Sequence, residues 1–357
     1  MNPFYYIIAL GLLASLYSNN VASYYFVKDF VFFAQVPIII GLGFYIGKRL
    51  ILVDRLIKFV VLSYCLAMLA DVVVVISHID EFLVDPIMFH NTYKTNSVNA
   101  ILVLIVILYQ RDSKSYFISK SYIRALAPIV FGYILISFSR TTMLIALLVL
   151  LIFYIGDRSK KHLFYVILLT PLFVQFAGEI VSLDRDPSNT GAVTFVGKLS
   201  NSLNELQIVD FDNQFDISHN WRGFEAFLGI EKYFSGDFFQ LLIGQGFGAS
   251  VKVPNWAFSN WNDPSLEGLR NPNIFHIGYV TILLKTGMMG LLLFVHFTST
   301  FFAQGKLHGF NNFLSQSLII LIVTTTFLTH GLIKPDLNPL ILIFLGISFR
   351  SLNEIKL

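Results

Sequence analysis

The chain alternates between long apolar runs and short basic connections, and this alternation breaks once, between residues 183 and 275. The runs are near-continuous rather than apolar at every second residue. A segment inside a bilayer must satisfy its backbone hydrogen bonds internally, so only helices and closed barrels cross it. The near-continuous runs favour helices. The pattern predicts an all-α polytopic membrane protein with one large polar loop that carries short helices.

The runs divide the chain into three parts. Residues 1–182 are expected to form an N-terminal transmembrane bundle, 183–275 the large loop, and 276–357 the C-terminal transmembrane helices. Several runs are shorter than the roughly 20 residues that span a bilayer, which indicates tilted or broken helices. About ten spans are expected, at residues 3–18, 30–47, 59–77, 97–110, 125–138, 141–156, 163–182, 287–303, 313–333 and 339–350.

Composition agrees with a membrane protein and excludes an ordinary soluble enzyme. Only 13% of the 357 residues are charged and 55% are hydrophobic, whereas soluble domains carry about 25% charged residues. The single cysteine, Cys65, excludes an internal disulfide. Neither a CxxC nor an HExxH zinc pattern occurs. We expect no metal, no cofactor and no nucleic-acid partner.

The distribution of positive charge predicts the orientation. More than half of the 25 Lys and Arg residues lie in connections 48–58, 111–124, 157–162 and 304–312 and in the tail 350–357. Basic connections stay in the cytoplasm. Both termini are therefore predicted to be cytoplasmic, and the large loop is predicted to face outward.

Two arginines are candidates for binding an anion. Arg140 stands between two apolar runs at the predicted outer boundary, where it would either snorkel to head groups or clamp an anion. Arg222 belongs to WRGFEAFLGIEKYF, residues 221–234, which has the pattern of an amphipathic helix lying on the membrane surface. It would either pair with Glu225 three residues on or present a guanidinium fork to phosphate.

The end of the loop supplies a glycine-rich element and a histidine. Gly244, Gly246 and Gly248 form GQGFG, which is either a backbone nest for an anion or a plain turn. His276 follows the polar NPN and begins an apolar segment. An imidazole where water meets membrane suits a general base, although a lone histidine is more often structural.

Three further residues are weaker candidates for contacts with substrate. Asp71 lies inside an apolar run, where a carboxylate is either functional or paired with a tyrosine, threonine or arginine. His330 flanks the last outer connection, and Arg270 lies in the polar end of the loop.

In combination, these motifs resemble those of the bacterial O-antigen polymerase and O-antigen ligase superfamily. SRTTMLIALL, from Ser139, is similar to the Ser-Arg element that opens a membrane helix in that family. The loop arginine and LLIGQGFG resemble its arginine and Gly-x-Gly elements. HIGYVTILLKTGMMG matches the family spacing from His276 to Gly287 and Gly290. Ile277 departs from the family pattern, which has an amide or hydroxyl at that position. The resemblance covers roughly residues 130–350.

The resemblance implies a GT-C-like glycosyltransferase of the bacterial inner membrane, with the large loop in the periplasm. Its donor would be a glycan on undecaprenyl pyrophosphate. Arg140 and Arg222 would bind the pyrophosphate, and His276 would be the catalytic base of a metal-independent, inverting transfer. The remaining candidates, Glu225 and the loop glycines among them, would contact substrate.

Three functions remain open on the sequence. An O-antigen polymerase, which joins lipid-linked repeat units and can work with a chain-length regulator protein, is favoured because the chain is compact. An O-antigen ligase, which transfers glycan to lipid A-core, would carry the same motifs. A polysaccharide flippase is the third alternative, although transporters commonly show internal repeats and none is evident here.

Overall fold

The computed structural model describes residues 2–18, 23–80, 97–112, 118–137, 139–155, 217, 220–257, 270–304, 309–329, 331–333 and 339–353. Within these ranges every regular element is a helix and no strand occurs. Three described helices are long and apolar enough to cross a bilayer: Ser23–Gly47, Ile51–Ser77 and Gly278–Phe302. The fold is therefore all-helical and consistent with a helical membrane protein, as the apolar runs predicted.

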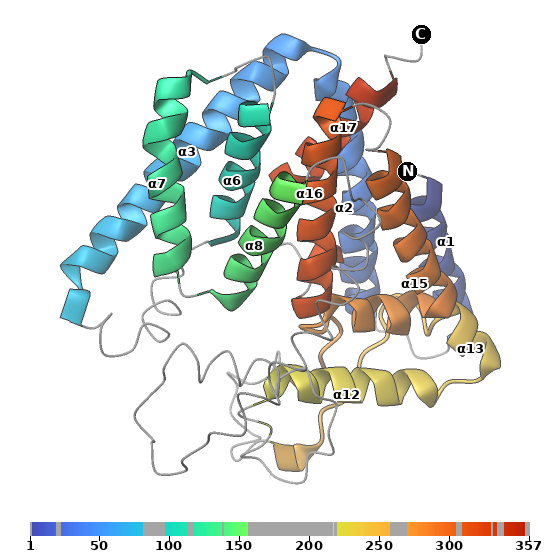
Figure 1. Cartoon of the computed structure of the whole chain (residues 1–357). Coiled ribbons are helices and arrows are strands. Elements are labelled where there is room, and N and C mark those ends of the chain that lie inside the picture. The colour runs from blue at the N-terminus through green and yellow to red at the C-terminus, as the bar shows by residue number, and fades with distance from the viewer. Residues whose placement is uncertain are drawn as a thin grey trace.

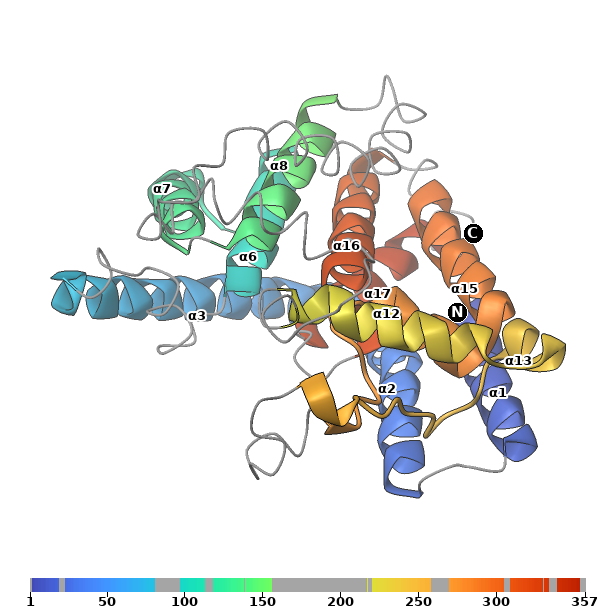
Figure 2. The ribbon, with the colours of Figure 1, turned by 90° about the horizontal axis from the view of Figure 1, so that it is seen from below.

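Most of the helices form an upright bundle, α3 (Leu50–Ser77) runs obliquely along one side, and a smaller layer lies across the lower end (Figures 1 and 2). The bundle contains α1 (Asn2–Tyr17), α2 (Ser23–Gly47), α3, α6 (Ser97–Asp112), α7 (Lys120–Ile136), α8 (Arg140–Ile155), α15 (Gly278–Gln304), α16 (Gly309–Leu328) and α17 (Pro339–Asn353). The lower layer and the short turns contain α12 (Trp221–Phe234), α13 (Phe238–Ile243), η2 (Asn255–Ala257) and η5 (Gly331–Ile333).

Each predicted run that falls in the described ranges is helical, and the run 163–182 lies outside them. Five of the described helices begin four or more residues earlier than predicted, and three of them by a wide margin. α2 begins at Ser23 rather than 30, α3 at Leu50 rather than 59, and α15 at Gly278 rather than 287. The added turns contain charged residues such as Asp29 and Lys285, which lower local hydropathy but do not end a helix.

The bundle packs around α6 and through glycine contacts. All side chains from Ala100 to Leu108 are buried, so α6 is surrounded by its neighbours. α2 and α17 pack backbone against backbone, because an added Cβ at Gly43 would overlap the backbone of α17 and one at Gly346 would overlap that of α2. Small residues at such contacts are the usual means of close helix packing in membranes.

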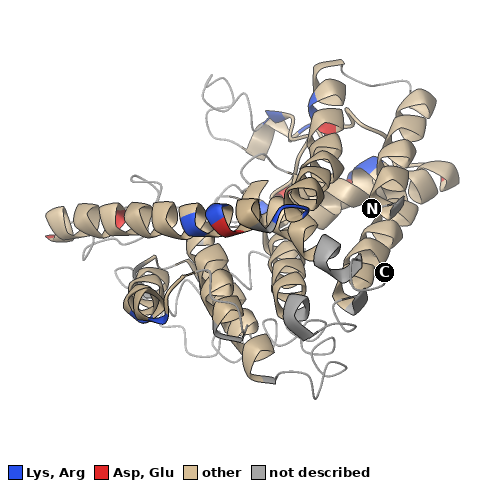
Figure 3. Ribbon diagram, turned by 90° about the horizontal axis from the view of Figure 1, so that it is seen from above, with Lys and Arg blue, Asp and Glu red and all other residues tan. Residues whose placement is uncertain are grey.

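One strongly basic connection lies at the upper end of the bundle, opposite α12. α1 begins and α17 ends on the side of the bundle that faces away from α12 (Figure 1). Seen from that end, Lys and Arg residues gather where α2 leads into α3 (Figure 3), which is the connection with Lys48, Arg49, Arg55 and Lys58. α12 lies at the opposite end. The described helices therefore separate this basic connection from α12, as the predicted topology requires.

α12 crosses the lower end of the bundle, roughly perpendicular to the upright helices (Figures 1 and 2). The predicted amphipathic helix 221–234 is confirmed, with these same bounds. α15 contributes to the same layer, because it is broken at Gly287, where φ is 68° and ψ is −170°. Its first part, from Gly278, lies across the lower end, and its second part rises through the bundle (Figure 1).

Candidate functional site

At the lower end of the bundle, His276 forms two hydrogen bonds with the carboxylate of Glu225. The Nδ1 atom of His276 lies 2.6 Å from Oε2 of Glu225, and the backbone N–H of His276 donates to the same oxygen over 3.1 Å. The indole N–H of Trp221 donates to Oε1 over 2.9 Å. Glu225 is 2% exposed, whereas the side chain of His276 is 33% exposed. A buried carboxylate that accepts three hydrogen bonds thus orients a histidine that reaches the surface.

This contact assigns the tautomer of the ring. A carboxylate only accepts hydrogen bonds, so Nδ1 of His276 carries the hydrogen, and the lone pair of a neutral ring lies on Nε2. A carboxylate behind a histidine fixes the ring orientation and stabilises the imidazolium that forms when the ring takes up a proton. The arrangement can therefore serve acid–base chemistry.

The local sequence explains how α12 carries this pair. The side chain of Asn220 accepts from the backbone N–H of Gly223 over 3.0 Å and so caps the first turn. The buried face of the helix contains Phe224 and packs on Phe275 at the start of the α15 segment. Gly229 allows this approach, because an added Cβ would overlap Val280 of α15 and press against Phe275. Glu225 and His276 therefore meet because two apolar faces pack together.

A second buried polar cluster fixes the chain on either side of His276. Oδ2 of Asp29, on α2, accepts from Nζ of Lys285 over 2.5 Å and from the backbone N–H of Gly248 over 2.7 Å. Its Oδ1 accepts from the side-chain amide of Asn273 over 3.0 Å. Nζ of Lys285 also donates to the carbonyl of Ala249. Asp29 and Lys285 are 1% and 0% exposed, so each charge has a partner and additional hydrogen bonds, as burial demands.

The glycine-rich element packs against the break in α15. Gly244, Gly246 and Gly248 have φ values of 90°, 88° and 88°, a region that favours glycine. The backbone N–H groups of residues 244–248 all donate to protein acceptors, which are the carbonyls of Gln240, Leu284, Lys285 and Gly11 and the carboxylate of Asp29. A nest for an external anion needs donors that face outward. The contacts therefore favour the turn over the nest.

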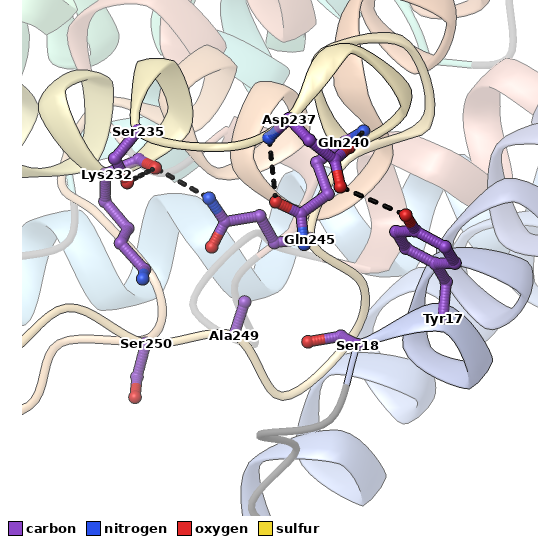
Figure 4. Close-up of a pocket in the computed structure, with 9 residues that line it drawn as sticks. All are labelled: Tyr17, Ser18, Lys232, Ser235, Asp237, Gln240, Gln245, Ala249 and Ser250. Carbon is purple, nitrogen blue, oxygen red and sulfur yellow. Dashed lines mark hydrogen bonds between the residues drawn. The ribbon is translucent and has the colours of Figure 1, made fainter.

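A polar pocket of about 590 Å³ opens beside the C-terminal end of α12 (Figure 4). Its walls come from the end of α1, from α12 and α13, and from the chain after the glycine element. Most of the lining side chains are polar, and the lining residues are Tyr17, Ser18, Lys232, Ser235, Asp237, Gln240, Gln245, Ala249 and Ser250.

Hydrogen bonds between the walls shape this pocket. The side-chain amide of Gln245 donates to the carbonyl of Lys232 over 2.6 Å, and the hydroxyl of Tyr17 donates to Asp237 over 3.0 Å. Tyr233, next to Lys232, joins α12 to α13 by donating to the carbonyl of Leu241 over 2.5 Å, and burial raises the pKa of its hydroxyl. The lining therefore offers both donors and acceptors of hydrogen bonds to a polar ligand.

The two candidate arginines lie on elements of the lower end. Arg222 is in the first turn of α12, three residues before Glu225, and is partly exposed. Arg140 is the first residue of α8, whose N-terminal end lies at the lower end (Figure 1). Ser139 precedes it, and the hydroxyl of Ser139 accepts from the hydroxyl of Thr142 over 2.9 Å. The side-chain position of Arg140 lies outside the part of the chain that is described.

The remaining candidates are dispersed. Asp71, on α3, accepts from the hydroxyl of Tyr133 on α7 over 2.5 Å, which confirms the tyrosine pairing foreseen as one alternative. The carbonyl of Arg270 accepts from the backbone N–H of Val253 over 2.9 Å, so it joins two segments of the loop. His330 lies outside the described residues.

The sequence reasoning missed Asp29 and Lys285 and the role of Glu225. Asp29 and Lys285 could have been identified by the criterion that singled out Asp71, because each is a charged residue inside or beside an apolar run. Glu225 was expected to pair with Arg222 or to contact substrate, whereas the structure pairs it with His276, 51 positions away.

Within the described residues no group of three or more His, Cys, Asp or Glu side chains could hold a metal ion. Searches of protein-family models, curated proteins and solved structures find no match to this chain.

Proposed function

We propose that this chain is a membrane glycosyltransferase that elongates a glycan carried on a lipid pyrophosphate, as an O-antigen polymerase does. The observation that carries the proposal is the pair formed by His276 and Glu225, in which a buried carboxylate orients a partly exposed imidazole. The resemblance of the sequence motifs supplies the substrate class. In this proposal the lower end of the bundle faces the periplasm, ten spans form a GT-C-like bundle in the inner membrane, and the run 163–182 supplies one of them.

The proposed reaction has His276 as general base. Nε2 of the neutral ring takes the proton of an acceptor hydroxyl, and the hydroxyl oxygen forms a bond to the anomeric carbon of the donor sugar. The bond from that carbon to the pyrophosphate oxygen breaks, and the pyrophosphate leaves with the electron pair. Attack opposite the leaving group inverts the carbon. The carboxylate of Glu225 stabilises the imidazolium until its proton passes to solvent.

Arg140 and Arg222 are proposed to bind the leaving pyrophosphate. Charge develops on its bridging oxygen as the bond breaks, and guanidinium groups bind phosphate with paired, charge-assisted hydrogen bonds. Both arginines belong to elements of the lower end, on α8 and α12. The bundle would hold the lipid tail while the pyrophosphate remains at the boundary.

The polar pocket is proposed to bind the acceptor glycan. Lys232, in its wall, is seven residues after Glu225 on α12, which corresponds to roughly 10 Å along the helix. A glycan that lies along α12 would thus extend from the pocket toward His276. Amide and hydroxyl groups such as those of Gln245 and Ser250 can both donate to and accept from sugar hydroxyls.

The test uses purified protein and a lipid-linked oligosaccharide. We expect His276→Gln to bind the donor normally but to transfer glycan about 100- to 10,000-fold more slowly, which is the usual contribution of a general base. His296→Gln is the matched control, because His296 is exposed on the second part of α15. A His276→Gln protein that transfers at the native rate would refute the assignment.

A deletion strain identifies the kind of transfer. Surface polysaccharide that carries a single repeat on its core would support the polymerase. Free lipid-linked polymer beside bare core would identify a ligase, and repeat units that accumulate inside the cell would identify a flippase.

A further inference from the structure

A second cavity, of about 490 Å³, lies between α6 and α7, in a part of the bundle that the proposed reaction does not use. Leu104, Ile107 and Leu108 of α6 form one wall, and Ile123, Ala127 and Phe131 of α7 form the other. Lys120 and Arg124, both exposed, complete the lining. Among the described residues, the lining is thus an apolar groove with two cations at Lys120 and Arg124.

The cations occupy one end of the groove. Lys120 is the first residue of α7 and Arg124 follows one turn later, so their Cβ atoms are about 5–6 Å apart on one helix face. α7 begins at the upper, basic end of the bundle (Figure 1). Two charges at this spacing can contact one phosphate group together.

The length of the groove matches one leaflet of a bilayer. From Lys120 to Phe131, α7 rises through eleven residues, which is roughly 16 Å. Half of a hydrocarbon core of roughly 30 Å is about 15 Å. When the cations lie at head-group level, the apolar part of the groove therefore covers the depth that an acyl chain of the same leaflet occupies.

We propose that this groove is a binding site for an anionic phospholipid. The phosphate contacts Lys120 and Arg124, and one acyl chain lies between α6 and α7. The evidence is the combination of charge at one end, an apolar wall along the rest and the length of a leaflet. A basic pocket between membrane helices is a known form of recognition site for anionic head groups. The site is independent of the glycosyl transfer proposed above.

The test is a lipid titration of delipidated protein in detergent, followed by native mass spectrometry. We expect phosphatidylglycerol to bind more tightly than phosphatidylcholine. Lys120→Gln combined with Arg124→Gln should weaken phosphatidylglycerol binding about 30-fold, corresponding to about 1 kcal/mol for each cation. The matched control is Arg55→Gln with Lys58→Gln, because it removes the same charge from the first turns of α3. The control should bind phosphatidylglycerol as the native protein does.

A second variant tests the apolar part. Ala127→Leu fills the groove without changing its charge, and it should weaken the binding of phosphatidylglycerol. Equal losses in the groove and control charge variants would overturn the proposal, since they would indicate general attraction to a basic surface. Equal binding of the two lipids would also overturn it. The proposal would also be overturned if the native protein were a dimer and Ala127→Leu were a monomer, because a second copy of the chain would then occupy the groove.

Discussion

The contact between Glu225 and His276 can be tested by replacing the carboxylate with an amide of the same shape. In Glu225→Gln, the side chain has one oxygen where the carboxylate had two, but the three donors remain: the indole of Trp221 and the backbone and ring N–H groups of His276. If the amide oxygen faces His276, the amide NH₂ faces the indole N–H. If the amide is flipped, the NH₂ faces Nδ1 and favours the other tautomer.

The expected loss follows from these contacts. A hydrogen bond to a charged group contributes about 1.5–3 kcal/mol, and the bond from Nδ1 to Glu225 becomes charge-assisted on both sides when the imidazolium forms. At about 1.4 kcal/mol for each factor of ten, Glu225→Gln should slow glycan transfer about 10- to 150-fold. Donor binding should change little, because Glu225 is proposed to act on the histidine rather than on the donor.

The assay measures transfer, donor binding and thermal unfolding for each variant. Glu231→Gln is the control, because Glu231 lies on the same helix but is exposed. The double variant Glu225→Gln with His276→Gln separates a positioning role from a structural one. If Glu225 acts through His276, the double variant should be no slower than His276→Gln alone. Rate losses that multiply, or a Glu225→Gln protein that transfers at the native rate, would refute the reasoning.

The remaining predictions concern the break in α15 and the topology. Gly287→Ala should lower the free energy of unfolding by at least about 1–3 kcal/mol, because φ and ψ there suit only glycine and an added Cβ would overlap the carbonyl of Leu242. Gly41→Ala, in open space on α2, should change it by no more than about 1 kcal/mol in the stabilising direction, and equal unfolding temperatures for both variants would contradict this account. In a protein without Cys65, a membrane-impermeant maleimide applied to intact spheroplasts should label Ser235→Cys, on the lower end, but not Ser119→Cys, on the basic end. The reverse labelling would invert the proposed orientation.

The helices were predictable because a bilayer leaves the backbone few alternatives. A near-continuous apolar run must be helical there, and α8 and α17 were located within a few residues by this rule alone. The errors occurred where charge interrupts a run. α2 was predicted to start after Asp29, because the hydropathy of neighbouring residues cannot reveal a distant partner. The charge of Asp29 is neutralised by Lys285, which lies 256 residues away in the sequence.

The sequence predicted several residues of the candidate site, but it did not predict which of them contact one another. His276 and the helix 221–234 were identified from their polarity pattern, and the same pattern placed Glu225 on that helix. Their pairing depends on the packing of α12 against the start of α15, which no spacing rule encodes. For the glycine element, the sequence allowed either an anion-binding nest or a turn. The protein acceptors of its backbone N–H groups, which only the structure shows, favour the turn.

The ion pair between Asp29 and Lys285 also has a consequence for the synthesis of the protein. Asp29 belongs to one of the first helices that leave the ribosome, and its lysine follows 256 residues later. At about 5–20 residues per second, the interval is roughly 13 to 50 seconds. During this time the carboxylate of Asp29 is without the lysine that neutralises it in the finished protein. A nascent chain interrupted before Lys285 would therefore expose an uncompensated acidic group, which the quality-control proteases of the membrane could use to recognise an unfinished product.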